Sequence, residues 1–261
     1  MEGMVFPAIN PVAIQLGPVA IYWYGVMYVL GIGLSAWVLY RPVTRQMRWD
    51  LDLYLSWITA LIIGIVVGGR LGYVVLYDWA YYMHHPVAIL HVWTGGMSFH
   101  GGLLGVLVAT AWVAKRERVR WLHLVDWLSF GGAIGVFFGR LGNFINGELV
   151  GRVTTVPWGL VFPHVGPEFR HPSQLYEAGL EGLGVGVLVW AVHRFFRLKP
   201  GQLAAIYLMA YSLARFVCEW FRQPDPQLGF VWGVLSMGHV LSLVGVAIGV
   251  LVFYGCSRRE A

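Results

Sequence analysis

Seven long apolar stretches recur along the chain, each separated from the next by a shorter segment that carries charged residues. Their approximate limits are residues 19–40, 51–77, 97–114, 122–145, 173–192, 202–221 and 236–254. A helix that crosses a bilayer needs about 20 mostly apolar residues, and each stretch is close to that length. The pattern predicts an all-α integral membrane protein with about seven transmembrane helices, forming a single domain over residues 1–261.

The composition agrees with this pattern. Apolar residues make up 58% of the chain and charged residues 12%, with a mean hydropathy of +0.65. Soluble domains carry about 25% charged residues. The 13 Trp and 13 Tyr suit the aromatic belts found at membrane interfaces. No Lys or Arg occurs in the first 18 residues, so the basic segment that opens a cleavable signal peptide is missing.

Lysine and arginine are unevenly distributed between the connecting segments. Segments 41–50, 115–120 and 193–200 and the C-terminal tail hold three, four, three and two of them, which is 12 of the 18. With seven spans, these four segments share one side of the membrane, and the positive-inside rule makes that side cytoplasmic. The N-terminus and three outer loops, about 78–96, 146–172 and 222–235, then form a small extracytoplasmic head. Topology thus accounts for the net charge of +5, and nucleic-acid binding is not indicated.

The other six arginines fall within spans, at their outer ends, or in outer loops: Arg70, Arg140, Arg152, Arg170, Arg215 and Arg222. Arginine presents a planar fork of donors that matches phosphate and carboxylate groups. A single arginine at this depth can instead extend its head group to the interface. Several arginines converging at one depth favour an anion site over that alternative.

The segment GRLGNFINGELVGR, residues 139–152, ends the fourth apolar stretch. Asn146 and Gly147 form a turn signal, so we expect the helix to end there. Arg140 and Asn143 are three apart and share a helix face. The polar residues of this segment are candidates for binding an anion or a lipid headgroup: Arg140, Asn143, Asn146, Glu148 and Arg152. A polar helix cap with an interfacial arginine is the structural alternative.

A second polar stripe lies in the sixth stretch. Tyr211, Arg215, Glu219 and Arg222 stand at i, i+4, i+8 and i+11, which is one face of a helix. Arg215 and Glu219 can form a purely structural ion pair or belong to the same anion site. In the fifth stretch, HPSQLYE starts at His171, and Pro172 suits a helix beginning. Gln174, Glu177 and Glu181 follow it into the span.

Two further residues are candidates for chemistry. His100 lies within GGMSFHGGLLG, residues 95–105, at the outer end of the third stretch. It can act as a general base or headgroup donor, or serve only as a structural residue. Ser98 has no G-x-S-x-G elbow around it, so a serine hydrolase is weakly supported. Tyr24, in YWYG, can belong to an aromatic belt or to a site. Cys218 and Cys256 indicate neither a disulfide framework nor a metal site, and no cofactor is expected.

Together these segments resemble the bacterial prolipoprotein diacylglyceryl transferases. The matching pieces, in the family's order, are YWYG at 22–25, GGMSFHGGL at 95–103, GRLGNFINGE at 139–148, RHPSQLYE at 170–177 and FRQPD at 221–225. The similarity covers essentially the whole chain, and the 139–148 string is highly specific. The segment between Gly151 and Arg170 is shorter than in some relatives, which leaves its contacts with a peptide substrate open.

The resemblance implies transfer of a diacylglyceryl group from phosphatidylglycerol to the lipobox cysteine thiol of a prolipoprotein, at the outer leaflet of the bacterial cytoplasmic membrane. It assigns headgroup binding to Arg140, stabilisation of the leaving phosphate or thiol activation to Arg215, and a candidate base to His100. Tyr24, Asn143, Glu148, Gly151, Tyr211 and Glu219 match family positions tied to activity. Arg70, Asn146 and Arg222 are further substrate-binding candidates, because they too fall toward the predicted outer side of the membrane.

Two other classes of function remain open. Arginines within spans and helices interrupted by glycine also mark the pathways of anion transporters. Transporters usually carry internal repeats and polar groups at the midplane, whereas here the polar groups gather toward one side. A structural assembly protein would leave the clustering of arginines unexplained. The pattern therefore favours an enzyme that works at the membrane interface.

Overall fold

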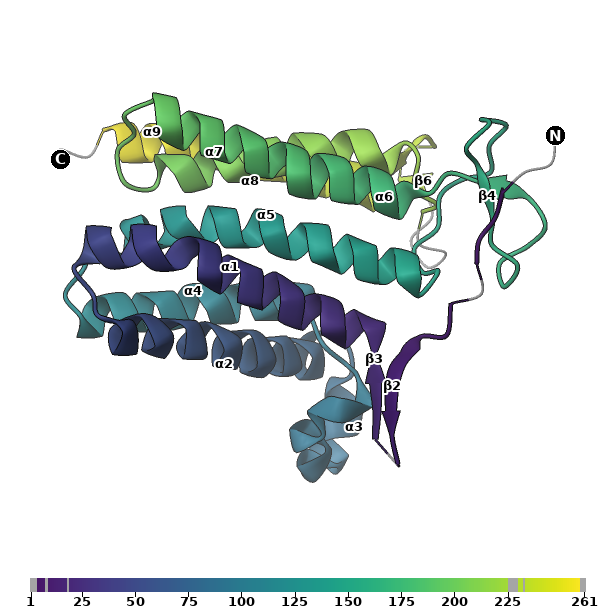
Figure 1. Cartoon of the computed structure of the whole chain (residues 1–261), viewed down its shortest axis with the longest axis horizontal. Coiled ribbons are helices and arrows are strands. Elements are labelled where there is room, and N and C mark those ends of the chain that lie inside the picture. The colour runs from purple at the N-terminus through teal and green to yellow at the C-terminus, as the bar shows by residue number, and fades with distance from the viewer. Residues whose placement is uncertain (1–3, 8, 18, 225–229, 232, 259–261) are drawn as a thin grey trace. The chain divides into compact units, whose positions relative to one another are not determined.

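The computed structural model describes residues 4–258 except residues 8, 18, 225–229 and 232. Each predicted apolar stretch contains one long helical segment (Figure 1). These segments are α1 (Trp23–Met47), α2 (Leu51–Leu76), α4 (Phe99–Arg116), α5 (Trp121–Ile145), the continuous run of α6 (Ser173–Glu177), η3 (Ala178–Gly184) and α7 (Val185–Phe195), α8 (Gln202–Glu219) and α9 (Met237–Ser257). The predicted all-α membrane fold is confirmed.

Five of these segments are long and apolar enough to cross a membrane: α1, α2, α5, the run from Ser173 to Phe195, and α9. Helices α4 and α8, with 18 residues each, are not among them. Large apolar side chains such as Trp37, Leu183 and Leu251 are exposed on the helices. Outward-facing side chains of this kind are what a bilayer solvates, and the chain is a multi-pass membrane protein.

Several helix limits differ from the approximate predicted ones, most of all the end of the first helix, which runs to Met47 rather than residue 40. The first helix begins at Trp23 rather than residue 19, because residues 19–22 pair as β3 (Val19–Tyr22) with β2 (Val12–Leu16) in an antiparallel hairpin. The sixth helix ends at Glu219 rather than residue 221. Arg222 therefore lies beyond the helix, where it forms an isolated bridge with Gly151.

Short strands and turns occupy the predicted outer segments. Strand β1 (Met4–Val5) pairs in parallel with β4 (Leu160–Val161), which pairs antiparallel with β5 (Phe169–Arg170). Strands β6 (Phe230–Val231) and β7 (Leu235–Ser236) form a second pair. Phe6, Phe162 and Val150 form a small apolar core beneath the three-stranded sheet. The segment between α2 and α4 holds α3 (Trp79–His84) and two 3-10 turns, η1 (Pro86–Leu90) and η2 (Val92–Thr94).

The chain divides into two compact units. The first unit comprises Met1–Trp37 and Asp126–Ala261, and the second comprises Val38–Val125. In the first unit, Val185, Val189 and Leu203 form a buried apolar cluster between α7 and α8. The Asp126 carboxylate accepts hydrogen bonds from the amides of Gly201 (2.7 Å) and Ala204 (2.9 Å). It thereby supplies the N-terminal cap that Gly201 itself lacks.

In the second unit, glycines bring α2 and α4 together. Gly64, Gly68 and Gly72 follow one another at every fourth position of α2, opposite Gly101 and Gly105 of α4. A Cβ atom on Gly64 would lie 2.6 Å from the Gly105 carbonyl oxygen. Small residues at this spacing let two membrane helices pack backbone to backbone, where van der Waals contact replaces the missing hydrophobic driving force.

Gly105→Ala should separate α2 from α4, because its new methyl group would overlap the Gly64 backbone, with 2.7 Å to the carbonyl carbon. We expect a loss of about 1–3 kcal/mol in the free energy of unfolding, typical of overpacking. Gly33→Ala in α1 is the matched control, because no atom lies within 4 Å of its added Cβ. Denaturation in detergent micelles measures the free energy of unfolding of both variants. Equal values would contradict the tight contact between α2 and α4.

Candidate functional site

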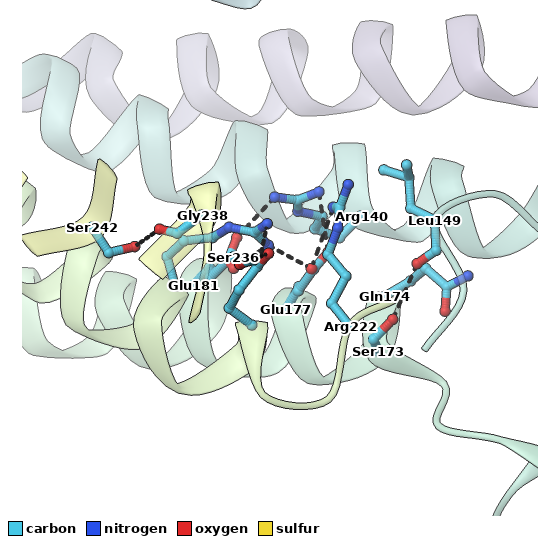
Figure 2. A network of polar contacts seen from close by, with 12 residues as sticks. Arg140, Leu149, Ser173, Gln174, Glu177, Glu181, Arg222, Ser236, Gly238 and Ser242 are labelled. Atoms are coloured by element: carbon cyan, nitrogen blue, oxygen red, sulfur yellow. Dashed lines mark hydrogen bonds and ion pairs between the residues drawn. The ribbon is translucent and has the colours of Figure 1, made fainter. Parts of the chain in front are cut away.

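Six charged side chains from α5, α6, η3, α8 and the segment after α8 form one network of ion pairs, part of which is labelled in Figure 2. They are three carboxylates and three guanidinium groups, so their formal charges balance: Glu177, Glu181, Glu219, Arg140, Arg215 and Arg222. All belong to the first unit. Burying an isolated charge is costly, and a charge-balanced group of paired ions reduces that cost. We refer to these six residues as the charge cluster.

Glu177 is the centre of the charge cluster. Its side chain is fully buried, and it contacts all three arginines. Its Oε2 lies 3.1 Å from an Arg140 nitrogen, while its Oε1 lies 2.6 Å from Arg215 and 3.6 Å from Arg222. One carboxylate therefore holds guanidinium groups from α5, from α8 and from the segment after α8.

Glu181 repeats this bridging one turn further along. It lies 3.1 Å from Arg140 and 3.4 Å from Arg215. Residues four apart share a helix face, so Glu177 and Glu181 both point toward the two arginines. The π-helical segment η3 carries Glu181, and its Gly182 comes so close to α5 that a Cβ atom would lie 2.7 Å from the Phe137 Cα atom. This close approach brings the carboxylates within reach of Arg140.

Glu219 connects the cluster to the start of α9. It pairs with Arg215 one turn earlier in α8, and it accepts a 2.7 Å hydrogen bond from the Ser236 hydroxyl. His239 closes a capping box by accepting the Ser236 amide at Nδ1, 3.1 Å away. The α9 backbone passes directly over the Glu219 carboxylate at Gly238, where a Cβ atom would lie 2.6 Å from Oε1. The first turn of α9 thus fixes the position of Glu219.

The exposed fractions of these side chains show how the charge cluster is layered. The arginine side chains are 17% (Arg140), 16% (Arg215) and 10% (Arg222) exposed, whereas Glu177 and Glu181 are 0% and Glu219 is 5% exposed. The accessible part of the charge cluster therefore belongs to the arginine side chains, whereas the carboxylates are buried. The buried carboxylates orient the guanidinium groups through these ion pairs.

The residues after α5 form a second polar group. The Asn146 amide donates to Glu148 Oε1 at 3.1 Å, and the Asn143 amide lies 3.5 Å from Oε2. Gln174 of α6 donates to the Glu148 carbonyl at 2.5 Å, and Ser173 donates to the Leu149 carbonyl at 3.1 Å. The start of α6 therefore holds the 146–149 turn, and Glu148 remains exposed. As predicted, α5 ends at Ile145 before this turn.

Gly151 lies where three segments cross. Its amide donates to the His171 carbonyl at 3.0 Å, and it bridges to Arg222. A Cβ atom here would lie 2.8 Å from the Phe221 carbonyl oxygen and closer still to that of His171. Only glycine fits such a close backbone approach. Burial lowers the pKa of His171, which favours its neutral ring, and its Nδ1 lies 3.2 Å from the Tyr176 hydroxyl.

The two predicted tyrosines lie on helices of the same unit. Tyr24 packs over Gly142, where a Cβ atom would lie 2.9 Å from the tyrosine ring, and its hydroxyl is 3.3 Å from that of Tyr28. Tyr211 stacks on Tyr207 with ring centroids 6.1 Å apart, one turn before Arg215. Tyr24 thus lies beside the end of α5 that bears Asn143.

His100 and Arg70 belong to the second unit. His100 is exposed in the first turn of α4 and packs edge-on against Phe99, with centroids 5.6 Å apart. Arg70 is 3% exposed, and its guanidinium group donates to backbone carbonyls of the segment before α4. The structure thus brings together Arg140, Arg215, Glu219 and Arg222 in one group and Asn143, Asn146 and Glu148 in another.

Two members of the charge cluster were not among the predicted site residues. Glu177 and Glu181 were noted only for their spacing after Pro172. Two carboxylates four apart in an apolar helix are nevertheless costly in a membrane, and such residues normally face a partner or a functional cavity. That cost was the available signal. It does not identify which arginines, more than 30 residues away, provide the partners.

A multi-pass helical membrane protein with a buried cluster of paired arginines and glutamates fits the class of proteins whose intramembrane charges mark a substrate or ion site. The family model for prolipoprotein diacylglyceryl transferase matches residues 11–255. The chain belongs to the prolipoprotein diacylglyceryl transferase family, as the sequence resemblance predicted.

Curated relatives match over almost their whole length. A phosphatidylglycerol–prolipoprotein diacylglyceryl transferase of Wolbachia pipientis wMel is 49% identical over 255 residues, which is 95% of each chain. Proteins of the same name from Legionella pneumophila (strain Lens) and Coxiella burnetii (strain RSA 331 / Henzerling II) are each 44% identical. These matches cover 96% and 98% of this chain and 98% and 99% of the relatives.

Glu177→Gln should destabilise the protein strongly, because it leaves three arginines with one fewer buried counter-charge. Removing one partner of a buried ion pair costs about 3–5 kcal/mol in the free energy of unfolding. Glu168→Gln is the matched control, since Glu168 is 49% exposed and lies 3.8 Å from Arg170. Exposed pairs contribute about 0–1 kcal/mol. Denaturation in detergent micelles distinguishes them, and a Glu177→Gln loss no larger than the control would contradict the central role of Glu177.

Proposed function

We propose that this protein transfers the diacylglyceryl group of phosphatidylglycerol to the thiol of a lipobox cysteine in a prolipoprotein. A thioether forms and glycerol phosphate leaves. The family membership supports this reaction, and so do the names of relatives up to 49% identical. The observation that carries it is the charge cluster, in which three partly accessible arginine side chains are held by buried carboxylates. This arrangement suits the phosphodiester of an anionic lipid.

The chemistry requires stabilisation of a leaving phosphate. The cysteine sulfur attacks the terminal glyceryl carbon, the carbon–oxygen bond breaks, and negative charge accumulates on the phosphate oxygens. Donors aimed in advance at developing charge are an effective catalyst in a site of low dielectric constant. Arg140 binds the headgroup phosphate and Arg215 stabilises the departing oxygen, while Glu177 and Glu181 hold both guanidinium groups in place.

The remaining predicted residues complete the assignment. The thiol must lose a proton, and we assign His100 as its acceptor, because an imidazole ring nitrogen can take up a proton as a general base. Tyr24 contributes to catalysis from a position beside the phospholipid headgroup. Residues that contact the substrates or shape their site are Arg70, Asn143, Asn146, Glu148, Gly151, Tyr211, Glu219 and Arg222. The nucleophile belongs to the substrate, so the enzyme needs no cysteine of its own and no cofactor.

We place the protein in the bacterial cytoplasmic membrane with its N-terminus outside and its C-terminus in the cytoplasm. The unequal distribution of lysine and arginine between the connecting segments supports this orientation. The end of α5 that carries Arg140 and Asn143 then faces the outer leaflet. Apolar side chains exposed along the helices give a two-tailed lipid a lateral route to the site.

Arg140→Ala should abolish most of the transfer, since removing one preorganised donor to a developing oxyanion costs about 100- to 1000-fold in rate. The assay combines purified protein, phosphatidylglycerol vesicles and a lipobox peptide, and mass spectrometry follows the gain of a diacylglyceryl group. Arg194→Ala is the matched control, because Arg194 is an exposed arginine of the same unit that lies over the Phe195 ring.

An unmodified peptide with correctly folded wild-type protein would contradict the transferase assignment. Phosphate uptake into the same vesicles would then favour an anion transporter. Equal rates for Arg140→Ala and wild type would retain the transferase but remove Arg140 from its site.

A further inference from the structure

Arg70 stands apart from the other membrane arginines. Its guanidinium group is buried, and no carboxylate among the described residues pairs with it. It makes instead one hydrogen bond for each of its five N–H groups, all to backbone carbonyls between α3 and α4. The acceptors are Ile89 (2.9 Å), Ala88 (2.6 Å), His91 (3.1 Å), Gly95 (2.5 Å) and Gly96 (3.2 Å).

Because all five N–H groups of Arg70 are already used, these hydrogen bonds limit which other groups it can bind. An arginine has five N–H donors and no acceptor, so none is left for a lipid phosphate while these bonds persist. Headgroup binding would require the arginine to break these hydrogen bonds and give up its present acceptors. The Tyr82 ring lies 5.1 Å from the Arg70 guanidinium carbon and adds a favourable contact with the cation.

The backbone of the 88–98 segment is shaped to meet Arg70. Gly95 and Gly96 have φ angles of +88° and +72°, a region that side-chain-bearing residues seldom adopt. With these angles, the carbonyl groups of Gly95 and Gly96 both point toward the Nη1 atom of Arg70. The next contact comes from the neighbouring α2 residue, because the Gly69 carbonyl accepts the Ser98 amide at 2.8 Å. Gly69 and Arg70 therefore hold the segment at both ends.

The held segment leads directly to His100. Ser98 is the N-cap of α4 and accepts the Gly101 amide at 3.2 Å, so the first turn of α4 starts from the point that Gly69 fixes. His100 lies within that turn. Any loosening of the segment is transmitted to the histidine through a single helical turn.

We propose that Arg70 is a positioning residue that fixes the 88–98 segment and thereby the location of His100, instead of binding the lipid headgroup. The proposal rests on the assignment of the thiol proton to His100 made under the proposed function. It requires no contact between Arg70 and either substrate. Loss of the five-carbonyl contact lowers the rate of proton transfer and leaves lipid binding unchanged.

The test uses Arg70→Lys, which keeps the charge but replaces the five-donor fork with a single ammonium group. Amide hydrogen exchange over residues 86–98 should become about tenfold faster, because local opening no longer breaks the full set of bonds. In the transfer assay we expect kcat to fall about tenfold with the KM for phosphatidylglycerol unchanged. Arg116→Lys is the matched control, an arginine of the same unit that contacts Glu117 and Trp112.

A double-mutant cycle separates positioning from an independent role. With His100 already replaced by Ala, Arg70→Lys should cause no further loss in kcat, because both changes remove the same contribution. Additive losses would overturn the proposal. A raised KM with unchanged kcat and unchanged exchange would also overturn it, and would assign Arg70 to the headgroup.

A second variant guards against simple misfolding. Gly95→Ala leaves Arg70 in place, and no atom lies within 4 Å of the added Cβ, so its only effect is backbone strain at φ +88°. It should reproduce the faster exchange and the lower kcat, and wild-type behaviour would contradict the proposal. The exchange measurement reads the Arg70 contacts even if wild type transfers no lipid, so failure of the transferase assignment remains distinguishable.

Discussion

The balance between three buried carboxylates and three guanidinium groups is the interaction on which the first unit depends. An unpaired charge within an apolar bundle would be expelled or neutralised, so neither the arginines nor the glutamates can occupy this position alone. Glu177 joins arginines from three different parts of the chain. The same pairing that makes the buried arginines tolerable also fixes the orientation of their guanidinium groups.

In the second unit, backbone carbonyl groups take the place of carboxylates as the partners of a buried arginine. A buried guanidinium group needs hydrogen-bond acceptors, and an irregular stretch of backbone leaves carbonyl groups in need of donors. Arg70 and the 88–96 backbone satisfy each other, one by supplying donors and the other by supplying acceptors. The close glycine contact holds α2, which carries Arg70, against α4, which follows the 88–96 segment. Two cationic sites in one chain are thus stabilised by different means, carboxylates in one and carbonyl dipoles in the other.

Helix positions were largely predictable because a bilayer tolerates few alternatives to an apolar helix of about 20 residues. Pro172 and Asn146-Gly147 also marked their helix ends, since a missing N–H group and a positive φ act locally. The start of α1 was missed because Val19–Tyr22 is as apolar as the helix after it. The hydrogen bonds of this segment to β2 make it a strand, and hydropathy does not identify such pairing partners.

Residue types and local spacing determined by themselves that this protein is a helical membrane protein, that Arg215 and Glu219 share a face, and that the 139–152 segment is polar at a helix end. Only the tertiary structure decided which charges meet. It paired Glu177 and Glu181 with Arg140 and Arg215 and turned Arg70 toward carbonyls 18 to 26 residues away. The physical reason is that a buried charge specifies that some partner must exist, whereas helix packing selects the partner.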